Sequence, residues 1–186
     1  SYKFIINCSS NKKYVTSRYN SSYDFDYKIA KKIIKLNTSY IFLSTRKVYK
    51  PNKNCKETDK VKPTCNYSKN KLITENTLKG ILSNRLLVLR ISNVIGITKK
   101  KSNKKLHNTF IDIFFKNIKK DFIIKNKNIF KDFVSSRKLG QLISKLIKMN
   151  AYGTYNLSIG KEIYLDHIVK WLNFYNPHSC KIINND

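Results

Sequence analysis

Hydrophobic residues in the first half of the chain alternate between short continuous runs and stripes with helical spacing. The runs at residues 2–8, 40–43 and 86–91 predict strands, of which the first and the last are apolar enough to be buried. Apolar residues three and four positions apart predict helices over residues 24–36 and 66–82. The apolar stripe of the second helix is predicted to consist of Leu72, Ile73, Leu78 and Ile81.

The pattern is less regular in the second half of the chain. It predicts a basic loop, an amphipathic helix, a short strand, a helix, a strand and a last helix, at residues 99–105, 109–118, 122–125, 138–149, 153–157 and 165–174. The order of strands and helices in the first half favours an α/β fold with a parallel sheet. The later residues are expected to form a smaller lobe beside that sheet.

The chain is strongly basic, with 38 Lys and Arg against 11 Asp and Glu and a net charge of +27. Such a charge is typical of proteins that bind a polyanion, such as nucleic acid, an anionic membrane or a nucleotide substrate. The same excess of lysine, together with abundant Asn, Ile, Tyr and Phe, would also arise from A/T-rich codons without selection for binding. The charge therefore leaves both interpretations open.

Cysteine and histidine are scattered, which predicts no metal site. The seven residues are Cys8, Cys55, Cys65, Cys180, His107, His167 and His178, and none of them has the spacing of a zinc site. Reduced thiols in a cytoplasmic protein are the default for this pattern, and Cys8, inside an apolar run, is expected to be buried. No apolar run approaches the roughly 18 to 20 residues of a membrane helix, and residues 1–10 lack the apolar core of a signal peptide. We therefore expect neither membrane insertion nor export.

Tyr67 and Lys71 are four residues apart on the second predicted helix, which places both side chains on one face of it. A lysine ammonium beside a tyrosine hydroxyl favours the phenolate and lowers the pKa of the tyrosine, which makes it a usable acid or base near neutral pH. In a chain so rich in Tyr and Lys, a surface pair without a function is the alternative.

A longer pattern surrounds this pair. A strand ends at Ser44-Thr45, and the chain continues through Val48-Tyr49, Glu57-x-Asp59, Pro63, Tyr67, Lys71 and Glu75. This spacing resembles the extended short-chain dehydrogenase/reductase family of sugar-nucleotide epimerases, dehydratases and reductases, and is especially close to its dTDP-4-dehydrorhamnose reductase branch. Further segments resemble family motifs in the family's order, at residues 5–8, 89–96, 131–143 and 155–163.

The resemblance implies a Rossmann-like parallel sheet with a small C-terminal substrate-binding lobe. Residues 1–96 would be the remaining part of the dinucleotide-binding domain. Residues 97–186 would mainly form the substrate-binding lobe, with residues 132–150 packing back on the first domain. The resemblance also implies NAD or NADP as the cofactor and a nucleotide-linked sugar as the substrate.

Carried over from the family, Thr45 would hydrogen-bond the reacting oxygen of the substrate. Tyr67 would exchange a proton with that oxygen as hydride moves to or from the nicotinamide, and Lys71 would hold the nicotinamide ribose and tune Tyr67. Without the resemblance, Thr45 would be a strand-end hydroxyl that caps a turn. Glu75 is expected to pair with Lys71 or with a surface lysine.

The resemblance also assigns binding roles. Ser9 would lie beside the cofactor, and Asn93 would contact the substrate, although its place in the sequence also suits a plain turn residue. Lys131 stands where the family usually has an arginine for the substrate diphosphate, so the charge is kept without the two-pronged geometry. Glu57 and Asp59 are expected only to anchor their loop.

One departure from the family concerns the cofactor. The five glycines, Gly80, Gly96, Gly140, Gly153 and Gly160, form no glycine-rich phosphate loop. The family carries that loop upstream of the part that this chain resembles. We therefore expect the chain to correspond to the C-terminal two thirds of such an enzyme, as a fragment, a split gene product or a remnant. A missing N-terminal segment or a homodimer would then be its partner.

Two functions follow from the sequence. The first is an NAD(P)-dependent enzyme that acts on a nucleotide-linked sugar, with epimerisation, dehydration and reduction not separated. The second is a non-catalytic basic module that binds nucleic acid or another polyanion.

Overall fold

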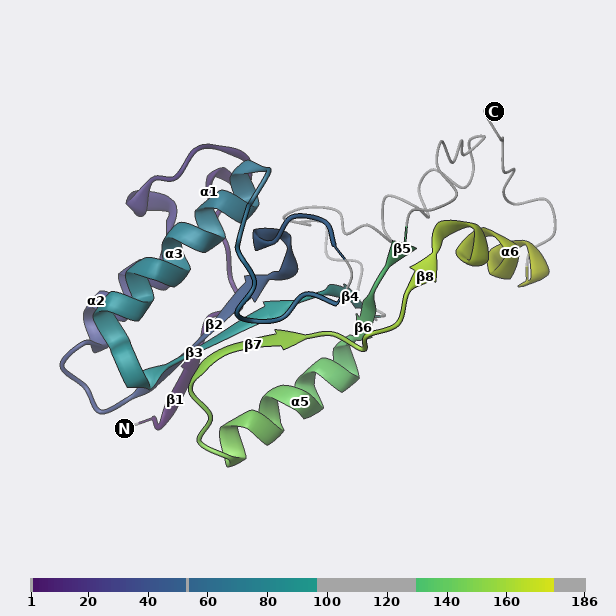
Figure 1. Ribbon diagram of the computed structural model, residues 1–186. Coiled ribbons are helices and arrows are strands. Elements are labelled where there is room, and N and C mark those ends of the chain that lie inside the picture. Colours follow the sequence, from purple (N-terminus) through teal and green to yellow (C-terminus); the bar gives the residue numbers. More distant parts are fainter. Residues whose placement is uncertain (1, 53, 97–129, 176–186) are drawn as a thin grey trace. The chain divides into compact units, whose positions relative to one another are not determined.

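The computed structural model describes residues 2–52, 54–96 and 130–175 (Figure 1). The chain divides into two compact units, the first formed by Ser1–Ser92 with Arg137–Leu157 and the second by Asn93–Ser136 with Ser158–Asp186. The elements expected at residues 99–125, together with His107, His178 and Cys180, lie outside the described residues.

The first unit is built on a parallel four-stranded sheet, as the sequence predicted. Its strands are β1 (Phe4–Ile6), β2 (Ser39–Thr45), β3 (Leu86–Ile91) and β7 (Gly153–Leu157), in the order β1-β2-β3-β7. All three neighbouring pairs are parallel. Every residue of β3 is buried, which fits a strand that is covered on both faces. The expectation of a buried first strand is wrong, because β1 lies at one edge of the sheet and is only half-buried.

Helices cover both faces of this sheet. They are α1 (Lys12–Thr16), α2 (Phe25–Ile33), α3 (Asn66–Leu82) and α5 (Ser136–Lys148). Figure 1 shows α2 and α3 on one face and α5 on the other. Three short 3-10 turns complete the unit: η1 (Ser21–Tyr23), η2 (Arg46–Val48) and η3 (Ser83–Arg85). The layers confirm the Rossmann-like α/β class that the sequence predicted.

The core of the first unit lies between the sheet and the helices α2 and α3. It consists of Ala30, Ile33, Tyr40, Phe42, Leu78, Leu82, Leu86 and Val88. Asp24 begins α2, since its side chain accepts a hydrogen bond from the backbone N–H of Tyr27 at 3.0 Å. This capping bond comes from Asp24, two residues before the buried Asp26, and fixes where α2 starts.

Helix α3 has the predicted bounds but not the predicted buried face. Of the expected apolar stripe only Leu78 is buried, and Ile73 is 40% exposed. The buried residues are Ser68, Asn70, Lys71, Thr74, Glu75, Leu78 and Leu82. Most of them are polar because the first half of the helix packs on polar partners: Asn70 donates to the backbone oxygen of Tyr14, and Thr74 bonds the hydroxyl of Tyr14. The helix therefore buries polar and charged side chains in its first part and leucine side chains at its C-terminal end.

The buried face of α3 predicts which of its side chains contribute most to the free energy of unfolding. We expect Leu78→Ala to lower the free energy of unfolding by about 2–5 kcal/mol, because Leu78 is fully buried in the core. The matched change Ile73→Ala, on the same helix, should cost well under half as much, because Ile73 is partly exposed. Urea unfolding of both variants checks this. Equal losses would contradict the observed face and favour the stripe read from the sequence.

The part of the second unit that the structure describes contains two small sheets and a helix. Strand β4 (Asn93–Ile95) pairs in parallel with β6 (Phe133–Ser135), and β5 (Phe130–Lys131) pairs antiparallel with β8 (Ile163–Tyr164). Helix α6 (Leu165–Tyr175) follows β8. The carboxylate of Asp132 accepts the backbone N–H groups of Ile159 and Gly160 at 3.1 and 2.6 Å.

Cys8 is exposed, so the expectation that it is buried is wrong, because the chain has already left β1 before it. Within residues 2–52, 54–96 and 130–175, none of the helices combines the length and the apolar character needed to cross a membrane. The same residues bring together no group of three or more metal-ligating side chains.

Candidate active site

Two of the residues singled out in the sequence meet at the carboxyl end of the sheet. Thr45 is the last residue of β2 and is buried, and Tyr67 lies in the first turn of α3. The Thr45 hydroxyl lies close enough to Tyr67 to lower the pKa of its phenol. The Thr45 hydroxyl also accepts the backbone N–H of Lys47 at 3.3 Å, so it caps a turn as well. Ligands of parallel α/β sheets bind at this end of the strands, which makes this contact a candidate site.

Lys71 lies one turn beyond Tyr67 and is buried. Its ammonium is 3.8 Å from the carboxylate of Asp26, and it lies over the ring of Phe42, 4.4 Å from the centroid. Burial lowers the pKa of Lys71, and the charge of Asp26 opposes that effect. The lysine thus has a carboxylate and an aromatic face as its surroundings.

Asp26, which the sequence analysis did not single out, is the acidic residue paired with Lys71. It lies in the first turn of α2 and is buried. Its Oδ1 accepts hydrogen bonds from Asn7 at 3.0 Å and from the hydroxyl of Tyr40 at 2.7 Å. Burial nevertheless raises the pKa of Asp26, against the lowering effects of Lys71 and these two donors. An acidic residue four positions before the buried Ala30 was the signal in the sequence, since it falls on the buried face of the helix.

The structure differs from the sequence analysis in the pKa of Tyr67. The expectation was that Lys71 lowers this pKa, but it is raised to about 12. Burial is the largest cause, the charges of Cys65 and Asp26 add to it, and the nearby hydroxyl of Thr45 opposes them. The physical reason is that burial disfavours the charged phenolate, and that the negative charge of Asp26 disfavours it further.

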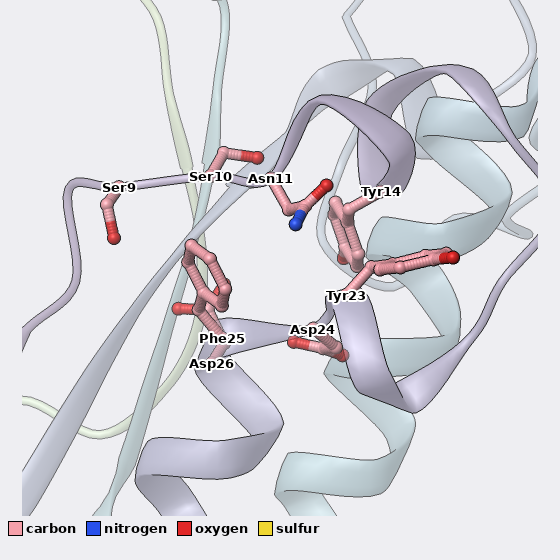
Figure 2. A pocket seen from close by; sticks show the side chains of 8 residues that line it. All are labelled: Ser9, Ser10, Asn11, Tyr14, Tyr23, Asp24, Phe25 and Asp26. Carbon is pink, nitrogen blue, oxygen red and sulfur yellow. The ribbon is translucent and has the colours of Figure 1, made fainter.

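Ser9 lies beyond the carboxyl end of β1 and is exposed. Its hydroxyl donates to Oδ1 of Asn7 at 2.7 Å, and the amide of the same Asn7 donates to Asp26. Asn7 therefore links Ser9, through Asp26, to Lys71. Ser9 also lines a small pocket (Figure 2), together with Ser10, Asn11, Tyr14, Tyr23, Asp24, Phe25 and Asp26.

Asn93 and Lys131, the two residues expected to bind substrate, belong to the second unit. The side chain of Asn93 donates to the backbone oxygen of Asp132 at 2.8 Å, in the strand pair of β4 and β6. Lys131 is half-buried on β5, opposite Ile163 of β8. Within this unit, Asn93 and Lys131 thus both lie next to Asp132.

The carboxylates of the 46–61 loop act as the sequence predicted. Glu57 accepts the backbone N–H of Asn156 at 2.7 Å, and Asp59 accepts that of Lys56 at 2.8 Å, so both anchor the loop. The expectation for Glu75 is wrong: its carboxylate pairs with Arg90, 2.7 Å away, because the two side chains face each other inside the unit. An arginine within the apolar run of β3 was the signal, since a buried charge needs a partner.

The raised pKa of Asp26 predicts that the stability of the fold depends on pH. A carboxyl whose folded pKa lies above the usual 3.8 stabilises the fold fully below that value, and this contribution is lost as pH rises through the folded pKa. We therefore expect wild type to lose stability relative to Asp26→Asn as pH rises from below 3.8. Urea unfolding of both proteins across this range checks the sign. A difference that grows in favour of wild type with rising pH would contradict it.

Comparisons with known proteins agree with this fold. No family model matches the sequence, and no curated protein matches it. A dTDP-4-dehydrorhamnose reductase from Bacillus anthracis, solved in complex with NADP, is 18% identical over 99% of this chain and 66% of its own, with a TM-score of 0.74. A UDP-N-acetylglucosamine 4-epimerase from Methanobrevibacter ruminantium, in complex with UDP-N-acetylmuramic acid, is 20% identical over 87% and 55%, with a TM-score of 0.71. A dTDP-glucose 4,6-dehydratase from Bacillus anthracis, in complex with NAD, is 14% identical over 99% and 61%, with a TM-score of 0.71.

This chain spans between 55% and 66% of the length of those three chains. At such low identity the likeness concerns the fold: the chain has the Rossmann-like α/β architecture that these sugar-nucleotide reductases, epimerases and dehydratases share.

Proposed function

We propose that the chain is the catalytic part of an NAD(P)-dependent enzyme of the extended short-chain dehydrogenase/reductase family that acts on a nucleotide-linked sugar. The observation that carries the proposal is the placement of Thr45 near Tyr67, with Lys71 one turn away, at the carboxyl end of a parallel sheet. The solved structures of similar fold are reductases, epimerases and dehydratases of sugar nucleotides. All three reactions begin or end with a hydride transfer assisted by the tyrosine and the lysine, and the proposal covers them together.

In this proposal Tyr67 exchanges a proton with the sugar oxygen, and Thr45 holds that oxygen with its hydroxyl. Thr45 opposes the rise in the pKa of Tyr67, so the same hydroxyl favours the ionised phenol. Lys71, buried and paired with Asp26, supplies the positive charge beneath the site. Asn93 and Lys131 contact the substrate, the lysine by its charge.

The residues present fit one end of the proposed cofactor. The buried ammonium of Lys71 and the polar end of β1 at Ser9 suit the hydroxyl groups of a nicotinamide ribose. The five glycines of the chain form no phosphate loop, so these 186 residues do not supply the usual site of the pyrophosphate. NAD or NADP, when bound, would supply or accept the hydride.

We further propose that the first unit is the remaining dinucleotide-binding domain and the second the substrate-binding lobe. An additional N-terminal segment, or a partner chain, would then complete the sheet beside β1. The intact mass of the protein isolated from its source tests this. A mass well above 21.9 kDa, or a tightly associated second chain, is the expected result. A single chain of 21.9 kDa would contradict it. A cytoplasmic location belongs to the same proposal.

The reaction itself is tested with the protein isolated from its source, NAD or NADP, and a panel of UDP- and dTDP-sugars. We expect turnover of at least one sugar, followed through the nicotinamide absorbance or through separation of the products. Absence of turnover, combined with tight binding to DNA or RNA that weakens steeply with salt, would favour the basic binding module instead.

A further inference from the structure

We propose that Glu75 is a positioning residue that aligns the strand end bearing Thr45 with the helix bearing Tyr67 and Lys71. This inference rests on the proposed function. It assigns a role to a buried ion pair that the proposed chemistry does not use.

Glu75 is fully buried and its carboxylate is shared between two donors. The hydroxyl of Ser44 donates to Oε1 at 2.5 Å, a short contact. Arg90 donates from Nε to both oxygens at 3.2 Å and from Nη2 to Oε2 at 2.7 Å. The guanidinium is only 5% exposed, so the pair is almost dry.

These contacts join three elements at the end of the sheet where the candidate site lies. Glu75 is one turn beyond Lys71 on α3, and Ser44 immediately precedes Thr45 on β2. Arg90 lies directly opposite Ser44 in the pairing of β2 with β3. The single carboxylate therefore fixes how far the end of β2 extends along α3, which sets the position of the Thr45 hydroxyl relative to Tyr67.

A second set of contacts extends from Arg90 to the neighbouring loop and strand. Arg90 donates to the hydroxyl of Tyr49 at 2.6 Å and lies over its ring at 4.9 Å. The hydroxyl of Tyr49 donates in turn to Asn156 of β7 at 2.9 Å. Arg90 also reaches the backbone oxygen of Glu57 at 3.4 Å. The loop that follows Thr45 is thus tied to the same pair.

The energetics favour a role in alignment over one in stability. Burying two charges carries a desolvation cost, and well-packed hydrophobic residues in place of a buried ion pair are often as stable or more so. Apolar side chains would, however, give no directional bond to Ser44. The charged pair therefore holds Ser44 in a fixed direction relative to α3, which apolar packing alone would not do.

The test compares Glu75→Gln with a double variant, Glu75→Met with Arg90→Leu, in the protein isolated or expressed as the full gene product. For Glu75→Gln we expect a fall in kcat of at least tenfold, with KM for the nucleotide sugar changed less than twofold. The double variant should have the same free energy of unfolding as wild type but should keep the lowered kcat. Glu162→Gln, which alters an exposed carboxylate, is the control and should keep the wild-type kcat.

A spectroscopic readout separates this inference from the proposed function. The chemical shift of the ring carbon that bears the Tyr67 hydroxyl reports the nearby hydroxyl of Thr45, and Thr45→Val gives the value without that hydroxyl. In Glu75→Gln the shift should move towards the Thr45→Val value. If wild type has no turnover, the proposed function fails, and this shift alone decides the inference. A wild-type shift in Glu75→Gln, or a double variant with wild-type kcat, would overturn it.

Discussion

Replacing Tyr67 with phenylalanine is expected to lower kcat by about 10²–10⁴-fold, which leaves no practical turnover. The change removes only the hydroxyl that would exchange a proton with the sugar oxygen. Because the ring stays in place, we expect the unfolding midpoint and most of the cofactor affinity to be retained. Steady-state kinetics with the best nucleotide sugar, together with cofactor titration, measure these quantities.

The control for Tyr67 is Tyr152→Phe, which removes a hydroxyl from a tyrosine of the same unit that is 67% exposed. This variant should keep the wild-type kcat. Turnover near wild type in Tyr67→Phe would end the assignment of Tyr67. A loss of fold in that variant would instead be visible as a lowered unfolding midpoint, and Thr45→Val would then test the same pair of hydroxyl groups from its other side.

Lys71→Met is expected to reduce kcat/KM by at least a hundredfold and to destabilise the fold as well. Two losses are combined here: the positive charge proposed to hold the nicotinamide ribose, and the partner of the buried Asp26 carboxylate, 3.8 Å away. Breaking a buried pair by removing one member is costly, on the order of 3–5 kcal/mol at most sites where it has been measured. Kinetics and urea unfolding of the same variant measure the two losses separately.

A second substitution separates the two losses in Lys71→Met. Adding Asp26→Asn removes the orphaned carboxylate while keeping an amide that the hydroxyl of Tyr40 can still bond. The double variant should regain most of the stability and none of the activity. Recovery of turnover in the double variant would mean that Lys71 serves only to neutralise Asp26.

Much of the first unit was predictable because its local signals agree with one another. The bounds of α3, β3 and β7 match the prediction, since each pattern is long or sharply bounded by polar residues. The motif that runs from Thr45 to Lys71 was visible through its resemblance to the family's pattern. It spans one strand end and one helix, so its residues follow one another closely in the sequence.

The partners of the buried charged side chains could not be predicted from the sequence. Asp26 and Lys71 are far apart in the sequence, and their pairing depends on how α2 and α3 pack on the sheet. Glu75 and Arg90 meet only because β3 pairs with β2 beside α3, which places Arg90 opposite Ser44. The sequence indicated that an arginine inside an apolar strand needs a partner, but not which one. The raised pKa of Tyr67 was not predictable either, because its largest cause is the burial of the phenol, which depends on tertiary packing.

The most direct test of the central claim is to trace hydrogen transfer between cofactor and sugar with deuterium. The full gene product is given NAD or NADP and a nucleotide sugar, with the label placed either on the reduced nicotinamide ring or on the reacting sugar carbon. Mass spectrometry then follows its movement. The proposed site predicts that label passes between the two in wild type and not in Tyr67→Phe. A folded protein that binds the cofactor but moves no label, or a Tyr67→Phe variant that moves it at the wild-type rate, would contradict it.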